Sequence, residues 1–270
     1  MVNYQSISKR TVAFFDILGF KALVKKYPID ELAKKYKMLI DQTEGLNRPL
    51  IKDENILSLF PNHPKNRPWC IKYLFSDAII LISENSDGVS CLKLLVYGWR
   101  LSQLCIVHKM PLRGGISYGD IYIDPHRNIV LGRALIDAYE LEKKQNWIGI
   151  AIDKSVEKAF PNLFKIIKDP SNVFNPLFLK YDVPFKDCST KKLHTLNWRL
   201  NLVVEKGTRS LFAKKGDRSI SKKVLNTLNY AKAVVASGQI YDYSKDLPVE
   251  LRTFFRGSEK NMPFKHGDDL

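Results

Sequence analysis

The sequence has few cysteines and no long apolar segment. Its 270 residues include four cysteines that stand far apart, at Cys70, Cys91, Cys105 and Cys188. No pair has the CxxC spacing of a zinc or redox site, and four are too few to cross-link so long a chain. No stretch reaches the roughly 20 apolar residues of a membrane span, and the N-terminus has no apolar core of a secretion signal. We therefore expect a cytoplasmic protein with reduced thiols.

Acidic residues are also in deficit. The chain has 43 Lys and Arg against 28 Asp and Glu, a formal charge of +15. Hydrophobic residues make up 45%, which excludes wholesale disorder. A basic surface suits a nucleotide, a nucleic acid or an acidic membrane. The run 209–223 motivates a nucleic-acid alternative, but no recognisable nucleic-acid module is present. We therefore expect no stable nucleic-acid or membrane partner.

Apolar patterning predicts the order β-α-β-β-α-β, followed by further helix and strand. Strands are expected at 11–18, 69–75, 78–83, 112–118 with 121–123, and 148–152; helices are expected at 20–43, 91–105, 131–144 and 223–236; irregular segments are expected at 45–68 and 171–190. A hairpin turn is predicted at residues 119–120. The order indicates an α+β, ferredoxin-like core with helices over one face of an antiparallel sheet. We expect this core at 9–155 and a C-terminal extension, 156–270, packed on it.

Two aspartates interrupt these strand-like runs. Asp16 lies within TVAFFDIL, and Asp77 lies between two runs with the spacing of a β-hairpin. An aspartate among apolar neighbours is costly to bury unless it is paired or binds a cation. Either residue alone is most simply a strand-end cap or a turn residue. Two on neighbouring strands instead indicate a Mg²⁺ or Mn²⁺ site, in which substrate phosphates supply further ligands.

The residues after Asp16 have the features of a phosphate-binding turn. Ile17, Leu18, Gly19 and Phe20 lead from a strand into a helix. Their backbone amides and the helix N-terminus favour an anion, and Gly19 permits its close approach. A pair of metal-binding carboxylates beside an anion site indicates phosphoryl or nucleotidyl transfer.

Four motifs in this region resemble those of class III nucleotidyl cyclases. They are FFDILGF at 14–20 and FSDAIILI at 75–82, which resemble the two metal motifs, LRGGISYGD at 112–120, and the helical GRALIDAYELE at 132–142. The resemblance implies a cyclase fold and two catalytic Mn²⁺ or Mg²⁺ ions held by Asp16, Asp77 and the Ile17 carbonyl. It also implies attack of the ribose 3′-hydroxyl on the α-phosphorus of a nucleoside triphosphate, in active sites shared by a homodimer.

The positions that read a purine base in that family are changed. Tyr73 stands where purine cyclases have a lysine, and Ile129 where they have an aspartate. Tyr73 can stack on a base or hydrogen-bond to it, or be an ordinary strand tyrosine. The combination resembles the pyrimidine cyclases of bacterial Pycsar anti-phage systems. It implies conversion of UTP to cyclic UMP, which activates a separate effector protein; cytidylate cyclase and purine cyclase activities are the alternatives.

Two further catalytic positions of the family are also changed. Ile136 and Glu140 stand where an asparagine and an arginine orient the ribose and stabilise the transition state. Arg133 lies two helical turns before Glu140 on roughly the same face, and is a candidate replacement. Lysines of the C-terminal part are another source of positive charge, and Arg113 is a candidate for phosphate binding, for the dimer interface or for a structural role. The changes also favour a nucleotide-binding regulator without catalysis.

Overall fold

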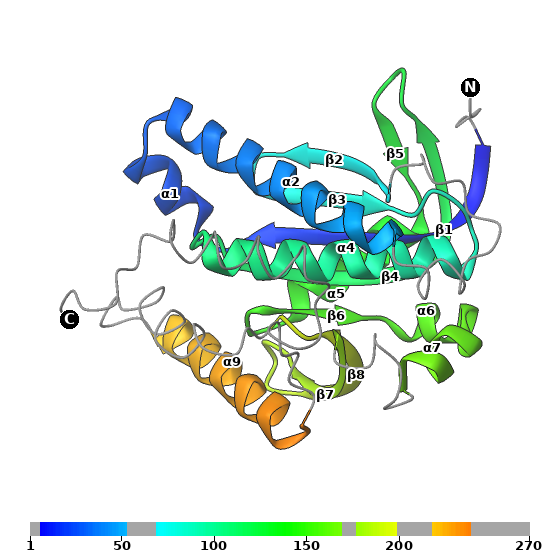
Figure 1. The fold of residues 1–270 in the computed structure, drawn as a ribbon. Helices are drawn as coiled ribbons and strands as arrows, with labels where there is room; N and C mark the ends of the chain where they lie inside the picture. Colours follow the sequence, from blue (N-terminus) through cyan, green and yellow to red (C-terminus); the bar gives the residue numbers. More distant parts are fainter. Residues whose placement is uncertain (1–5, 53–68, 169–176, 199–217, 239–270) are drawn as a thin grey trace.

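In a computed structural model, residues 6–52, 69–168, 177–198 and 218–238 are described (Figure 1). The elements are β1 (Ser6–Ile17), α1 (Phe20–Lys26), α2 (Ile29–Lys52), β2 (Ile71–Phe75), β3 (Ala78–Ile82), α4 (Gly88–Val107), β4 (Leu112–Asp124), β5 (Ile129–Leu131), α5 (Arg133–Lys144), β6 (Gly149–Ile152), α6 (Lys154–Ala159), α7 (Pro161–Lys168), β7 (Phe178–Pro184), β8 (Thr190–Leu196) and α9 (Arg218–Ala236).

The described strands form one sheet with the order β2-β3-β1-β4-β6-β8-β7, and β5 pairs with β4 beside this path. The β4–β6 pair is parallel, and the other described pairs are antiparallel. The predicted α+β fold with a mostly antiparallel sheet is therefore confirmed. β1 lies between β3 and β4 and carries the first of the predicted site residues to one end of the sheet.

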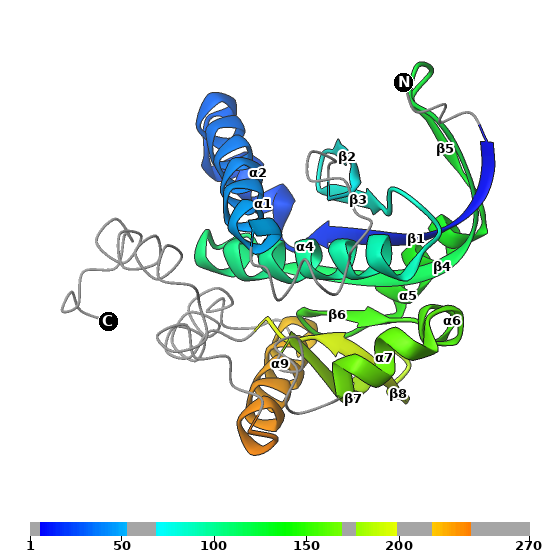
Figure 2. The same ribbon diagram turned by 45° about the vertical axis from the view of Figure 1, so that its right-hand side comes forward.

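The helices cover both faces of the sheet, not one face as the sequence predicts. α4 runs along β1 and β4 (Figure 2), and a Cβ placed on its Gly98 would lie 3.0 Å from the Phe15 ring. α5 packs on the opposite face, where Tyr139 contacts Phe14 edge to face with ring centroids 5.2 Å apart. Successive residues of a strand point to opposite faces, so the contacts of Phe14 and Phe15 show that the two helices lie on opposite faces. α5 lies on the crossover connection that the parallel β4–β6 pair requires.

The first helical segment is interrupted at Pro28, although the sequence pattern predicts one helix over 20–43. α1 ends before Tyr27, which is extended (φ −113°, ψ 141°). The residue before a proline is driven out of the helical region by contact with the proline ring. α2 then continues through residues 45–52, which were predicted as part of a loop. The remainder of that loop, 53–68, lies outside the described residues.

A single strand, β4, passes through residues 119–120, so the hairpin turn predicted there is wrong. Gly119 pairs with Arg10, because β1 begins earlier than predicted and supplies a partner for this stretch. The turn comes later, where the amide of Asn128 donates to the carbonyl of Pro125 over 3.4 Å. β5 then returns along β4. This β4–β5 hairpin projects beyond the rest of the sheet (Figure 1).

The C-terminal part of the chain extends the same sheet. β8 pairs with β6 and β7 pairs with β8. The prediction of an irregular segment over 171–190 is wrong over β7, whose sequence FLKYDVP mixes charged and apolar residues without a long apolar run. Residues 169–176 of that segment lie outside the described residues. The predicted helix at 223–236 is confirmed as α9, which begins earlier, at Arg218.

α4 is more deeply buried than its amphipathic pattern predicts. Trp99 and Leu101 are buried, and so are the polar side chains of Arg100, Ser102 and Gln103. The side chains of α4 are thus enclosed nearly all round. None of the described helices, α4 included, combines the length and the apolar composition needed to cross a lipid bilayer.

Candidate functional site

The two aspartates predicted to bind metal lie next to each other at one end of the sheet. Asp16 pairs in register with Ala78 of β3, and Asp77 directly precedes Ala78 in the turn from β2. The amide of Ile17 donates to the Asp77 carbonyl over 2.9 Å, which ties the end of β1 to this turn. Ser76 adopts a left-handed conformation (φ 55°), as a tight turn requires. The structure therefore brings the two residues together.

The carboxylate of Asp16 is half-buried and lies between charges of both signs. Burial raises its pKa, the positive charge of Arg113 opposes that shift, and the negative charge of Asp77 adds to it. Its Oδ2 lies 3.7 Å from Nη2 of Arg113. Two carboxylates that raise each other's free energy in this way favour a bound cation, because a cation compensates both charges at once.

The oxygen donors at this point fit a hard divalent cation that takes some of its ligands from the protein and some from a substrate. Asp16 and Asp77 supply carboxylates, and the Ile17 carbonyl was predicted as a backbone ligand. No group of three or more His, Cys, Asp or Glu side chains that could hold a metal ion occurs in the described part of the chain. Mg²⁺ commonly binds through one or two carboxylates and completes its coordination with water and substrate phosphates. The donor set therefore suits Mg²⁺ or Mn²⁺ together with a phosphate-bearing substrate.

The turn at 17–20, which the sequence predicts as a phosphate site, has fewer free backbone amides in the structure than predicted. The amide of Ile17 already donates to Asp77, and the amide of Leu18 donates to the carbonyl of Pro111 over 2.9 Å. Gly19 precedes α1 in a left-handed conformation (φ 79°), with no atom within 4 Å of the position that a Cβ would take. The amides of Gly19 and Phe20 are the donors that this turn can still offer to an anion.

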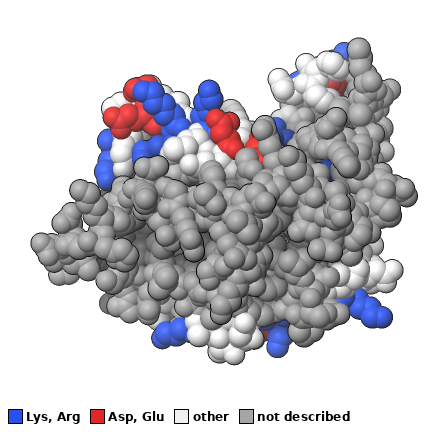
Figure 3. Space-filling model, in the orientation of Figure 1, with Lys and Arg blue, Asp and Glu red and all other residues white. Residues whose placement is uncertain are grey.

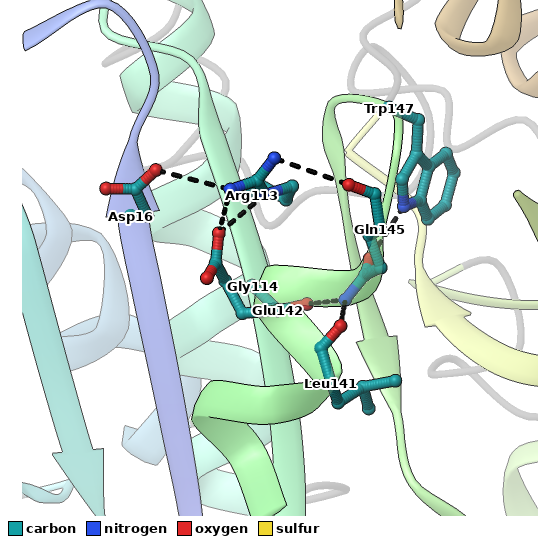
Figure 4. Close-up of polar contacts among 7 residues, drawn as sticks. All are labelled: Asp16, Arg113, Gly114, Leu141, Glu142, Gln145 and Trp147. Atoms are coloured by element: carbon teal, nitrogen blue, oxygen red, sulfur yellow. Dashed lines mark hydrogen bonds and ion pairs between the residues drawn. The ribbon is translucent and has the colours of Figure 1, made fainter. Parts of the chain in front are cut away.

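A buried polar network connects Asp16 to α5 (Figure 4). Arg113 pairs with Asp16 across the β1–β4 ladder, and its Nε donates to Oε1 of Glu142 over 2.5 Å. Its Nη1 donates to the carbonyl of Gln145 over 3.3 Å. Gln145 in turn donates to the carbonyl of Gly114 over 2.8 Å. These contacts hold the guanidinium of Arg113 in one orientation beside Asp16.

Glu142 and Gln145 are the site residues that sequence reasoning missed. Glu142 is buried, and a signal for it exists: it shares the inward spacing of Ala134, Ala138 and Leu141 on α5. A glutamate at a core-facing helical position requires a partner of opposite charge. Burial raises the pKa of Glu142, whereas the positive charge of Arg113 lowers it. Arg113 is therefore the partner that this position required.

Tyr73, the predicted base contact, lies on the same face of the sheet as Asp16. It pairs with Ile80 on β3, which pairs with Phe14 on β1, two residues from Asp16. Its side chain packs against the apolar cluster beneath α5, and its hydroxyl is enclosed without a hydrogen-bond partner among the described residues. Burial raises its pKa, and the negative charge of Asp124 adds to the shift. Tyr73 thus has hydrogen-bonding capacity that the described structure does not use.

Arg133 lies at the opposite end of α5 from the aspartates. Glu142, near the end of α5, contacts Arg113, whereas Arg133 begins the helix nine residues earlier, or about 13 Å along its axis. Its exposed side chain donates to Asp137 over 2.8 Å. Ile136 is exposed on the same helix. The structure therefore does not bring Arg133 to Asp16 within one chain, and the role predicted for it needs a second subunit.

No protein-family model matches the chain, and no curated protein does. Among solved structures, nucleotidyl cyclase domains are similar to it. The catalytic core of a rhodopsin-guanylyl cyclase with converted specificity, in complex with ATPαS, is 12% identical, with 71% of this chain and 97% of that chain covered and a TM-score of 0.47. The adenylyl cyclase CyaB from P. aeruginosa is 13% identical, with 73% and 97% covered and a TM-score of 0.47. A guanylyl cyclase domain from the aquatic fungus Blastocladiella emersonii is 12% identical, with 72% and 98% covered and a TM-score of 0.49. This likeness is one of fold only, and it assigns no role to any residue.

Proposed function

We propose that this protein is a nucleotide cyclase that converts UTP to 3′,5′-cyclic UMP and pyrophosphate. The observation that carries the proposal is the position of Asp16 beside Asp77, with a nitrogen of Arg113 3.7 Å from the Asp16 carboxylate. Carboxylates supply ligands for a divalent cation, and an arginine next to them suits a phosphate group. Cyclisation of a nucleoside triphosphate is a reaction that uses both.

In this proposal the chain's own residues position the reactants. Asp16, Asp77 and the Ile17 carbonyl would hold two Mg²⁺ or Mn²⁺ ions, which would lower the pKa of the ribose 3′-hydroxyl and neutralise the phosphates. The 3′-oxygen forms a bond to the α-phosphorus, the bond to the β-phosphate breaks, and the hydroxyl proton leaves to solvent. Gly19 and Phe20 offer amides to the phosphates. Glu142 holds Arg113 in place, so the positive charge of Arg113 stays on the face of the sheet that α5 covers.

The preference for a pyrimidine base rests on Tyr73. Its enclosed hydroxyl lacks a partner among the described residues, so a base edge that reached it would gain a hydrogen bond at little desolvation cost. Tyr73→Phe should therefore raise KM for the preferred triphosphate and reduce discrimination between UTP and CTP. An unchanged ratio of kcat/KM for the two substrates would remove Tyr73 from base recognition.

We infer a homodimer with shared active sites, because the role proposed for Arg133 would require a second copy of the chain. Ile136 and Tyr139 on α5 and Phe75 on β2 are exposed apolar residues, and they suit a contact with a second copy. Arg133 of one copy would then serve the aspartates of the other. Separately inactive Asp16→Ala and Arg133→Ala proteins should regain activity when mixed, because one of the two sites in the mixed dimer is intact. Failure of mixing to restore any activity would contradict shared sites.

The alternatives to a cyclase are a nucleotide-binding regulator and a nucleic-acid-binding protein. The side chain of Glu140 is half-exposed and bonded to Lys144 over 3.2 Å, and it cannot stabilise negative charge, which favours a regulator that binds nucleotide without turnover. A nucleic-acid-binding protein would need a basic stripe. In Figure 3, described acidic and basic side chains lie intermingled over α1 and α2, so the described side chains there form no such stripe.

The experiment is a product assay on purified protein with Mn²⁺ and UTP, CTP, ATP or GTP separately. A cyclic pyrimidine product that Asp16→Ala and Asp77→Ala both abolish would support the proposal, with the exposed Asp30→Ala as the matched control. A cyclic purine product would overturn the base assignment. Triphosphate binding without product would favour the regulator. The proposed place of the reaction is the cytoplasm, where the product activates an effector protein of anti-phage defence.

A further inference from the structure

A tyrosine on α2 contacts the turn that carries Asp77. The hydroxyl of Tyr36 donates to the carbonyl of Ser76 over 2.7 Å. Ser76 directly precedes Asp77 in the two-residue turn between β2 and β3. The carbonyl of Asp77, the second in this turn, accepts from the amide of Ile17. Both carbonyls of the turn are therefore held from outside the β2–β3 hairpin, one by α2 and one by the end of β1.

The contact from Tyr36 falls on the residue whose backbone most needs support. Ser76 has a φ of 55°, in the left-handed region that residues with a side chain seldom occupy. Such a conformation persists where the surrounding contacts hold it. Loss of the contact would free the turn to adopt other conformations, and the side chain of Asp77 would move with it.

A second contact aligns α2 with β2. The side chains of Glu44 and Lys72 form an ion pair. Tyr36 and Glu44 are eight residues apart on α2, or about 12 Å. Ser76 and Lys72 are four residues apart along the strand and its turn, or about 13 Å. Because the two spacings match, α2 runs antiparallel beside β2 and holds the hairpin at two points (Figure 1).

The core, and not the turn, determines where Tyr36 lies. Leu32 and Leu39 are buried, and they lie four residues before and three residues after Tyr36, which is the spacing of one helical face. Oε1 of Gln42, further along α2, lies 2.9 Å from Nε2 of His108 at the end of α4. The helix that presents Tyr36 is therefore fixed independently of the hairpin.

The ring of Tyr36 makes a separate contact with the turn at 17–20. It packs edge to face against Phe20, with ring centroids 6.0 Å apart and an interplanar angle of 81°. The amide of Phe20 is one of the donors that this turn offers to an anion. Burial raises the pKa of Tyr36, so its hydroxyl keeps the proton that it donates to Ser76. Hydroxyl and ring thus contact two different parts of the site.

We propose that Tyr36 is a positioning residue for the metal ions: through Ser76 it holds the turn in the conformation that brings Asp77 next to Asp16. It touches neither metal nor nucleotide. α2 then supports the aspartates separately from the Arg113 network on α5. The inference rests on the proposed function only for the reaction that the metal serves, because metal binding can be measured without turnover.

The first test measures Mn²⁺ binding without nucleotide, by electron paramagnetic resonance of the unbound ion, well below the Tm of each variant. Tyr36→Phe removes the hydroxyl, keeps the ring and should raise Kd by about three- to tenfold. The control is Tyr118→Phe, which removes a hydroxyl 3.5 Å from the carbonyl of Ser86 and lies about 17 Å along β4 from the partner of Asp16. It should change Kd by less than about twofold. Asp77→Ala should abolish saturable binding, which identifies the site.

The cyclase assay separates the two contacts of Tyr36. Tyr36→Phe should raise the Mn²⁺ concentration for half-maximal rate by the same factor as Kd, and KM for UTP at saturating Mn²⁺ should stay within about twofold. Tyr36→Leu also loses the ring contact with Phe20 and should raise both quantities. A purely structural role would lower the Tm and leave the Mn²⁺ dependence unchanged.

Three outcomes would overturn the inference: no saturable Mn²⁺ binding that Asp77→Ala removes, unchanged Kd in Tyr36→Phe, or an equal rise in Tyr118→Phe. The proposed function fails separately. If Mn²⁺ binding depends on the Tyr36 hydroxyl but no triphosphate is cyclised, the positioning role stands and the cyclase does not. If cyclic product forms while Tyr36→Phe changes neither Kd nor the Mn²⁺ requirement, the cyclase stands and the positioning role does not.

Discussion

Two nitrogens of Arg113 contact the same carboxylate oxygen of Glu142. Nε donates to Oε1 over 2.5 Å, and Nη2 pairs with that same oxygen. The two side chains are only 8% and 4% exposed. A buried pair of this kind contributes modestly as a unit, but removal of one member leaves the other charge without compensation. The pair therefore controls where the guanidinium lies relative to Asp16.

Glu142→Ala should destabilise the protein by about 3–5 kcal/mol, because Arg113 would remain buried without its main partner. Glu142→Gln keeps an acceptor and should cost less. The measurement is urea unfolding followed by circular dichroism. The matched control is Glu140→Ala on the same helix, whose exposed pair with Lys144 is worth at most about 1 kcal/mol. Equal losses of unfolding free energy in Glu142→Ala and Glu140→Ala would contradict a stabilising role for the buried pair.

Gly115→Ala should also destabilise the fold, by about 1–3 kcal/mol or more, because α5 crosses β4 in direct contact with this residue. A Cβ at Gly115 would overlap the carbonyl oxygen of Ala138 and lie 2.9 Å from the amide nitrogen of Glu142. At Gly119 the nearest atom would be 3.6 Å away, so Gly119→Ala serves as the control. Thermal unfolding of both variants gives the comparison. A Gly115→Ala protein as stable as Gly119→Ala would show that α5 can move away from β4.

Asp16→Asn should stabilise the metal-free protein at neutral pH. Burial raises the pKa of Asp16, so the folded state holds its proton more tightly than the unfolded state does. That contribution to stability is present below the ordinary aspartate pKa of about 3.9 and is lost as pH rises through the raised value. The gain from asparagine should therefore appear at pH 7 in EDTA and vanish at about pH 3.

Addition of Mn²⁺ gives the complementary measurement on the same two proteins. A cation that binds Asp16 and Asp77 should raise the Tm of the wild type and leave that of Asp16→Asn nearly unchanged, since ligands stabilise only the state that binds them. An equal Mn²⁺ effect on both proteins would place the metal elsewhere.

Tyr230→Ala should release α9 from the sheet. Tyr230 is fully buried, its ring centroid lies 4.7 Å from that of Trp147, and its hydroxyl donates to the carbonyl of Leu196 over 3.1 Å. Truncation should cost about 3–5 kcal/mol, whereas Tyr230→Phe removes the hydroxyl contacts with Leu196 and Thr195 and should cost about 1–3 kcal/mol. Hydrogen exchange of the α9 amides should accelerate strongly in the first variant only. Unchanged exchange in Tyr230→Ala would mean that other contacts hold the helix.

The sequence predicts the central part of this site better than its surroundings. Asp16 and Asp77 could be placed together because apolar alternation identifies their strands and a two-residue turn fixes the hairpin. The contact of Glu142 with Arg113 depends on how α5 crosses β4, which no local pattern specifies. The break at Pro28 was readable from the proline alone.

Other predictions from the sequence were wrong because tertiary contacts override the local sequence pattern. The turn predicted at residues 119–120 was overridden because β1 supplies a partner strand for this part of β4. β7 was missed because its pairing with β8, not its own composition, makes it a strand. The docking of α9 was out of reach for a similar reason, since it depends on contacts of Asn226 and Thr227 with residues 146–148, far away in the sequence.

The pairing of β8 with β6 has a consequence for biosynthesis. After β6 has been synthesised, about 40 more residues must be translated before β8 appears. Until β8 forms, the β6 edge of the growing sheet has unpaired N–H and C=O groups. A nascent or truncated chain that ends near residue 155 would present that edge to other chains and self-associate. The β6 edge is covered only when Thr190–Leu196 has left the ribosome, so β8 protects an edge that the strands before it leave unpaired.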